Sequence, residues 1–234
     1  MNLLTFSNPK IQKGTRLGYL TAILHFAPHK LAGVNVCPKA SPECIVLCLN
    51  TAGRGGIIKR GETTNRIQLC RVRRTRLFVE HRDEFFHQLI ADIRKVIHIA
   101  DGMNLKPAIR LNGTSDIRWE NILVDDGFEG KNIFDLFPAV QFYDYTKIPG
   151  RLSLPNYHLT FSQSEVNGME TLEEMDSGRN IAVVFAEVPA FYKGRPVVDG
   201  SESDLRFLDP PGVVVGLCAK GKARKGTYRF VVRD

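Results

Sequence analysis

Three of the five cysteines in this chain lie close together, within residues 35–56. Cys37, Cys44 and Cys48 are spaced C-x6-C-x3-C, and a glycine-rich turn follows them. Cysteine thiolates bind iron–sulfur clusters and zinc, and three thiols on one short loop suit a cubane cluster. The loop at 35–56 therefore predicts a [4Fe-4S] cluster with these three cysteines as its ligands.

The local sequence indicates how these thiols would converge. Ser41-Pro42-Glu43 is typical of a helix start, because serine caps the N-terminus, proline fits the first position and an acid favours the first turn. A helix from there would place Cys44 and Cys48 four residues apart on one face, with Cβ atoms about 5–6 Å apart. Cys37 would fold back over the helix start, where the helix dipole favours thiolate.

The sequence leaves the fourth ligand open. A cubane held by three cysteines has one iron free for water, a side chain or a small molecule, and Cys70, His25 and His29 are the protein candidates. The two histidines have H-x3-H spacing, so zinc held by three cysteines and one histidine is an alternative. Buried cysteines without metal are a third interpretation, since free cysteine is often buried. We expect Cys70 and Cys218 to be packing residues, the latter in the core.

The composition is that of an ordinary globular protein. The chain has 234 residues, 43% of them hydrophobic and 24% charged, and we expect one α/β domain over residues 1–234. No apolar run approaches the length of a membrane span, and the N-terminus has no signal-peptide pattern, so no membrane partner is expected. An odd number of cysteines, three of them bunched, argues against disulfides and favours a reducing, cytoplasmic setting.

A basic segment suggests a second class of function. The net charge is +7, and the window at 54–76 carries many arginines and lysines against one acid, Glu62. Basic segments bind phosphate groups, so a zinc- or cluster-stabilised nucleic-acid-binding protein is the alternative function. Because no aromatic side chains are interleaved with the basic ones, we expect such binding to be weak and non-specific.

The hydrophobic pattern alternates between strands and helices along the chain. Alternating elements predict a mainly parallel α/β sheet, and strands that are apolar nearly throughout indicate that both faces are covered. Five or six such units fit an open, partial (β/α) barrel. The segment at 225–232 is expected to form a hairpin with the strand before it. The strands are predicted at 17–27, 106–113, 138–145, 156–162, 180–187 and 212–219, and the main helices at 64–79, 83–101 and 165–176. Short helices are predicted around 117–123 and at 132–137.

In folds of this kind the chemistry lies at the carboxyl ends of the strands. The cysteine loop follows the first predicted strand, so it lies at that edge. The sequence RLNGTSD follows the second strand, where Asn112, Thr114 and Asp116 are predicted to bind a small polar ligand and Gly113 to allow its close approach. An unknown small molecule or redox partner is therefore expected.

The chain resembles the bacteriophage "gene product 88" family along its whole length. The resemblance lies in GYLTAILHFAPHK, NVCPKASPEC, RRTRLF, RLNGTSDIRWE and DLRFLDPPGVVVGLCAKG. It implies a viral protein that works in the cytoplasm of the infected host cell. It does not imply a particular reaction.

The layout also resembles the radical SAM superfamily, which has a partial (β/α) barrel and a three-cysteine cluster loop after the first strand. This resemblance implies a redox or radical-type enzyme, with S-adenosylmethionine as a cofactor at the open iron. The superfamily spacing is C-x3-C-x2-C, and its Gly-Gly-Glu signature is replaced here by Asn112-Gly113-Thr114. We therefore expect weak or absent binding and cleavage of S-adenosylmethionine. A closed cluster serving electron transfer is a further interpretation.

Overall fold

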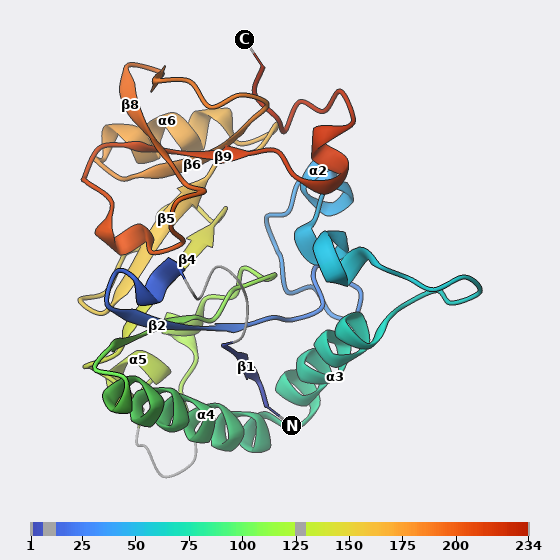
Figure 1. Ribbon diagram of the computed structural model, residues 1–234, viewed down its shortest axis with the longest axis vertical. Coiled ribbons are helices and arrows are strands. Elements are labelled where there is room, and N and C mark those ends of the chain that lie inside the picture. The colour runs from blue at the N-terminus through green and yellow to red at the C-terminus, as the bar shows by residue number, and fades with distance from the viewer. Residues whose placement is uncertain (1, 7–12, 125–129, 234) are drawn as a thin grey trace.

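A nine-stranded sheet organises the computed structural model, which describes residues 2–6, 13–124 and 130–233 (Figure 1). The strands lie in the order β1-β2-β3-β4-β5-β6-β9-β8-β7. Their bounds are β1 Leu4–Thr5, β2 Tyr19–Leu24, β3 Lys106–Arg110, β4 Gln141–Thr146, β5 Tyr157–Ser162, β6 Ile181–Phe185, β7 Phe191–Tyr192, β8 Arg195–Asp199 and β9 Val214–Cys218.

Most strand pairs in this sheet are parallel. The pairs from β2 through β6 to β9 and β8 are parallel, whereas β1 and β7 pair antiparallel at the two edges. From β1 to β6 the spatial order follows the chain order, so each connection adds the next strand on the same side. The fold is therefore mixed α/β with a mostly parallel sheet that is not closed, and the predicted class is confirmed at that level.

The helices connect the strands as the periodicity predicts. The bounds are α2 Pro42–Val46, α3 Arg66–Glu80, α4 Arg82–Gly102, α5 Ile133–Leu136 and α6 Gly168–Asp176. Asn65 caps α3, because its side chain accepts a hydrogen bond from the Gln68 N–H. Figure 1 shows α4 and α5 in the lower part of the view, α6 at the top, and α2 and α3 on the right. None of the described helices is long and apolar enough to cross a bilayer.

The largest core cluster fixes β2 and the two long helices to each other. Phe26, just beyond β2, packs against Phe78 of α3 and Phe85 of α4, with ring centroids 5.2 and 5.7 Å away. Trp119 stacks on Phe85 at 6.1 Å and is fully buried. Aromatic contacts of this kind each contribute about 0.5–1.5 kcal/mol beyond the burial of area. The chain that leads from β2 into the cysteine loop therefore starts from a rigid base.

Three features of the fold differ from the sequence prediction. The segment at 225–232 is not a strand of a hairpin; Val232 forms a parallel bridge with Phe185, and its N–H donates to Val184. These backbone groups are thereby committed to β6 rather than to β9. Near Trp119 only a 3-10 turn forms, Trp119–Asn121, and the short strands β7 and β8 were not predicted.

Candidate functional site

One cavity of about 300 Å³ lies at the carboxyl ends of the parallel strands. Its lining comes from the ends of β3, β4, β5, β6 and β9, from the segments that follow β2, β3, β4, β8 and β9, and from Phe230 near the C-terminus. The polar and sulfur-bearing side chains around it are Cys37, Cys44, Cys48, Arg110, Asn112, Thr114, Ser115, Asp116, Tyr145, Thr146, Lys147, Ser162, Ser201, Asp204, Cys218 and Lys220. The three cysteines singled out in the sequence thus meet at one place.

Cys37 is held in the wall of the cavity by backbone groups. Its Sγ accepts a hydrogen bond from the His29 N–H at 3.3 Å and donates one to the Thr114 carbonyl at 3.7 Å. Burial, with smaller contributions from the neighbouring Cys48 and Cys44, raises the pKa of the Cys37 thiol to about 12, although the hydrogen bond from the His29 N–H opposes the shift. The expected thiolate at a helix start is therefore wrong for the metal-free chain, because burial outweighs the helix dipole. Metal coordination deprotonates a thiol and reverses this preference.

Cys44 and Cys48 do not share a helix, contrary to the prediction. Helix α2 ends at Val46, Leu47 has turn geometry, and Cys48 is extended with φ −54° and ψ 132°. The chain leaves the helix there because Asn50, in the 3-10 turn after Cys48, is held from α3 by the Arg71 guanidinium. Cys44 and Cys48 nevertheless line the same cavity.

Hydrogen bonds through two carboxylates hold the short helix α2 in place. Ser41 caps it as predicted, since its Oγ accepts from the Cys44 N–H. Glu165, after β5, accepts from the Ser41 hydroxyl at 2.7 Å and from the Glu43 N–H at 2.9 Å. Glu43 in turn accepts from the Phe230 N–H at 2.7 Å. The cysteine loop is thus fixed by two carboxylates to distant parts of the chain.

The predicted ligand-binding set after β3 lines the cavity, but its side chains bond to the protein. Asn112 Oδ1 accepts from the Ser115 hydroxyl, the Ile117 N–H and the Trp119 indole. Thr114 donates to the Phe26 carbonyl at 2.6 Å. These contacts fix the loop that receives the Cys37 thiol.

Asp116 is likewise satisfied within the protein. Its Oδ1 accepts from Thr146 and from Arg151, and its Oδ2 accepts from the Lys147 N–H at 2.7 Å. Gly113 is needed for packing rather than for approach of a ligand, because an added Cβ would lie 2.6 Å from both Ile23 Cγ2 and the Leu24 carbonyl. The turn after β3 therefore presses directly on the end of β2.

The three protein candidates for a fourth ligand do not line the cavity. Burial and the nearby Arg71, Arg110 and Arg74 lower the pKa of His25 to about 3, so its ring is neutral at physiological pH. Cys70, which was expected to be a packing residue, is half-buried on α3.

Cys218 was expected in the core, and this prediction is wrong. Cys218 is exposed and lies on the rim of the same cavity as the three clustered cysteines. It is the last residue of β9, where the buried part of the strand has ended and the chain emerges at the carboxyl edge. An apolar sequence pattern does not reveal where along a strand the cover stops.

A buried ionic network adjoins the cavity, and sequence reasoning missed it. Arg110 pairs with Asp204 at 2.8 Å and lies 3.7 Å from Asp144. Asp144 accepts from the Tyr157 hydroxyl, which accepts from Arg151 at 3.2 Å. Burial raises the pKa of Asp144 to about 7, although Arg110 opposes the shift. The signal for this network was Arg110 at the end of β3 and Asp144 within β4, charged residues next to largely buried neighbours.

A second group of polar residues lies beside the cysteines, and Lys147 is the member that the sequence did not single out. Lys147 Nζ donates to the Ser162 hydroxyl at 2.7 Å and lies 5.3 Å from the centre of the Phe230 ring. Its charge lowers the pKa of Cys48, which burial raises. The Tyr145 hydroxyl is buried and has no hydrogen-bond partner in the protein. A cationic donor and an unpaired hydroxyl thus accompany the thiols.

Among the described residues, no group of three or more histidine, cysteine, aspartate or glutamate side chains is placed to hold a metal ion. Comparison with curated proteins gives no match, and comparison with solved structures gives none. The family model described as "Gene product 88" matches residues 2–234. The chain therefore belongs to the gene product 88 family.

Proposed function

We propose that this protein binds a [4Fe-4S] cluster through Cys37, Cys44 and Cys48 and uses it in redox or radical-type chemistry on a small molecule. The observation that carries the proposal is that the three clustered thiols line one cavity. All three are free, and none is paired in a disulfide.

The side-chain chemistry around the three cysteines suits such a group, although the described residues are not arranged as a ready-made set of metal ligands. A set of sulfur donors is what iron–sulfur clusters use, and the surrounding hydrogen bonds and charges tune them. Lys147 and Arg71 lie near Cys48 and would offset the negative charge of coordinating thiolates. Glu165 and Glu43 hold the loop in place, while Leu47 and Phe230 supply apolar cover. When bound, a cluster supplies single-electron transfer.

The proposal extends to the architecture of the sheet. We infer an open, partial (β/α) barrel of the radical SAM kind, supported by parallel strands that lie side by side in chain order from β2 to β6. The cysteine loop follows the first of these strands, as in that superfamily. Asn112 and Thr114, which stand where the Gly-Gly-Glu signature would be, are bonded within the protein and support weak S-adenosylmethionine binding at most.

The test is anaerobic purification with iron and sulfide assays. We expect brown protein with about four irons and four sulfides per chain. Cys37→Ala, Cys44→Ala and Cys48→Ala should each lose the colour, with Cys→Ser variants as a check on folding by circular dichroism. Cys70→Ala and Cys218→Ala should keep it. Colourless folded protein with stoichiometric zinc would overturn the proposal and favour the zinc alternative.

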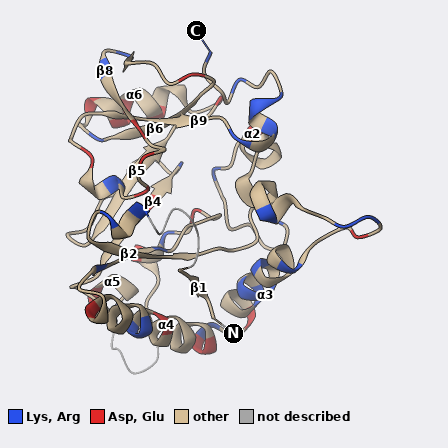
Figure 2. Ribbon diagram, in the orientation of Figure 1, with Lys and Arg blue, Asp and Glu red and all other residues tan. Residues whose placement is uncertain are grey.

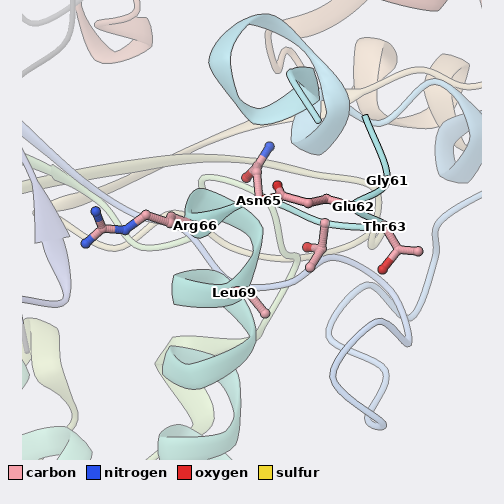
Figure 3. A pocket seen from close by; sticks show the side chains of 7 residues that line it. Gly61, Glu62, Thr63, Asn65, Arg66 and Leu69 are labelled. Carbon is pink, nitrogen blue, oxygen red and sulfur yellow. The ribbon is translucent and has the colours of Figure 1, made fainter. Parts of the chain in front are cut away.

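A second candidate function is nucleic-acid binding by the outer side of α3. Arg66, Arg73 and Arg76 are exposed, and Figure 2 shows the helix and the projecting loop before it carrying basic residues. A hollow lined by Gly61, Glu62, Thr63, Thr64, Asn65, Arg66 and Leu69 joins the loop to the helix, and Figure 3 shows Arg66 extending away from Asn65.

This candidate has fewer basic groups than the sequence suggested. Arg71 bonds to Asn50 and Arg74 to the Asn2 carbonyl, so both are committed to the protein. We expect weak, non-specific binding whose affinity falls steeply with salt. Filter binding of single- and double-stranded DNA at several salt concentrations tests it, and each of Arg66→Ala, Arg73→Ala and Arg76→Ala should flatten the salt slope by about one unit. Tight, sequence-selective binding would promote this function over the first.

A further inference from the structure

The amide and carboxylate acceptors that line the cavity are already used by the protein. Asn112 Oδ1 accepts three hydrogen bonds, and the two carboxylate oxygens of Asp116 accept three between them. Thr146 Oγ1 donates to Asp116 and accepts from the Ile148 N–H. Asp204 is paired with Arg110. A ligand in the cavity would therefore find few acceptors for its own donors.

The donors of the same lining are different. The Lys147 ammonium has three N–H groups, and the described contacts show one of them used, by Ser162. The Ser162 hydroxyl accepts that bond and keeps its own proton to donate. The Tyr145 hydroxyl is buried without a partner in the protein. The cavity thus has donors to spare, and one of them carries a charge.

These donors are positioned by the sheet. Tyr145 and Lys147 are two residues apart at the end of β4, so their side chains leave the same face, about 7 Å apart along the strand. The register pairs Thr146 with Phe161, which brings Lys147 beside Ser162 at the end of β5. All three line the cavity that contains the cysteines.

The remaining lining is largely apolar. It consists of Pro28, Leu47, Leu49, Val184, Leu217 and Phe230, with small residues between them. Burying an unpaired hydroxyl or ammonium is costly, and a negatively charged acceptor offsets that cost. A ligand that complements this lining would therefore have hydrogen-bond acceptors at one end and an apolar body.

We propose that the cavity binds a small organic oxyanion, a carboxylate or a phosphate ester with an apolar body, whose oxygens bond to Lys147, Ser162 and Tyr145. The inference deepens the proposed function, because it names the class of small molecule that lies beside the cysteine site and so rests on that cavity being functional. The volume of about 300 Å³ is at the lower end of the range for small-molecule sites.

The test uses three probes that share an aromatic body: benzoate, phenyl phosphate and uncharged benzyl alcohol. Each is titrated by calorimetry, at low salt, into the full chain in its cluster-free reduced form and after anaerobic reconstitution with iron and sulfide. We expect one site, at least tenfold tighter for one of the oxyanions than for benzyl alcohol. The preferred oxyanion distinguishes a carboxylate ligand from a phosphate ester.

Variants locate the site. Lys147→Met should weaken oxyanion binding at least tenfold and Tyr145→Phe about threefold or more, whereas Lys147→Arg should retain part of it. Lys222→Met removes an exposed lysine outside the cavity and should leave binding unchanged. Circular dichroism separates lost binding from lost folding. If Lys147→Met does not fold, the loss of binding in Tyr145→Phe tests the site instead.

The outcomes separate this inference from the cluster proposal. Oxyanion binding without any iron incorporation would uphold the inference and overturn the cluster. Iron incorporation with no oxyanion binding in either form would overturn the inference alone. Equal affinity for benzyl alcohol, or binding unaffected by Lys147→Met, would also overturn it and leave Lys147 as a counter-charge for the cysteines.

Discussion

Single residues at this site are constrained by contacts that span the chain. Gly113 is the strongest case, because an added Cβ would lie 2.6 Å from the Leu24 carbonyl and from Ile23 Cγ2. The next residue, Thr114, supplies the carbonyl that receives the Cys37 thiol. A change at one glycine therefore bears on both the packing of β2 and the position of a proposed ligand.

We expect Gly113→Ala to lower the free energy of unfolding by about 1–3 kcal/mol, the usual cost of overpacking a tight site. It should also reduce iron incorporation, because the turn must move away from β2. Urea denaturation and the iron assay measure the two effects. Gly102→Ala is the matched control, since nothing lies within 4 Å of its added Cβ and α4 ends there. Equal stability of the two variants would contradict the packing argument.

His25 gives a second prediction at this scale. Burial, Arg71 and Arg110 lower its pKa to about 3 from the usual 6.5 of histidine, so folding favours the neutral ring. Because the folded pKa is depressed, the contribution to stability is present above pH 6.5 and is lost as the pH falls toward 3. Proton–nitrogen NMR should show a neutral His25 ring at pH 5, with His25→Gln used to assign the signal. A ring that titrates near pH 6.5 would show that it is open to water.

At the scale of elements, the cysteine loop depends on a helix too short to be stable alone. Helix α2 has five residues, and isolated helices of that length do not persist in water. Its position is set by Glu165, which bonds to Ser41 and Glu43, and by the bond from Phe230 to Glu43. The carboxylate of Glu165 also complements the partial positive charge of the helix start.

We therefore expect Glu165→Ala to affect the position of the cysteine loop strongly and the stability of the whole fold only modestly. We expect a loss of about 0.5–2 kcal/mol in unfolding free energy, as for other N-terminal caps, and a larger fractional loss of bound iron. Chemical denaturation and iron content per chain measure the two effects. Glu173→Ala on α6 is the control, because its side chain is exposed. If both variants hold iron equally well, Glu165 does not position the cysteines.

The sequence predicted elements better than it predicted their ends and partners. Helices α3 and α4 and the parallel strands follow from hydrophobic periodicity, a local property. The extended geometry of Cys48 does not, because it depends on Asn50 being held by Arg71 from another helix. Glu165 and Lys147 reach the site through the register of β4 and β5, which no local pattern shows.

At the scale of the whole molecule, the cavity exists because strands added in chain order bring all their carboxyl ends to one edge. Residues that line it range from Pro28 to Phe230, so nearly the full length of the chain contributes. It could be predicted that Cys37, Cys44 and Cys48 lie near one another, because they belong to one short loop. The loss of Thr114 and Asp116 to internal hydrogen bonds could not be predicted, because it depends on Phe26, Thr146 and Arg151 from other parts of the chain.

The last prediction concerns the coordination position that three cysteines leave free on a cubane. His25, His29 and Cys70 do not line the cavity, so water or a small molecule is expected there. S-adenosylmethionine is the candidate that the superfamily resemblance offers. In the turn at Asn112-Gly113-Thr114, the side chains of Asn112 and Thr114 bond to the carbonyls of Ile117 and Phe26, and Gly113 packs on β2. Few polar groups of this turn are therefore free to bind that cofactor.

We therefore expect the paramagnetic resonance spectrum of the reduced, reconstituted protein to be unchanged when S-adenosylmethionine is added. No 5′-deoxyadenosine should form, and Cys48→Ala should give no cluster signal at all. A changed spectrum together with 5′-deoxyadenosine would make the protein an enzyme of the radical SAM kind despite its different turn. An unchanged spectrum that Cys70→Ser then alters would mean that α3 moves to close the cluster, and would favour electron transfer over chemistry on a bound substrate.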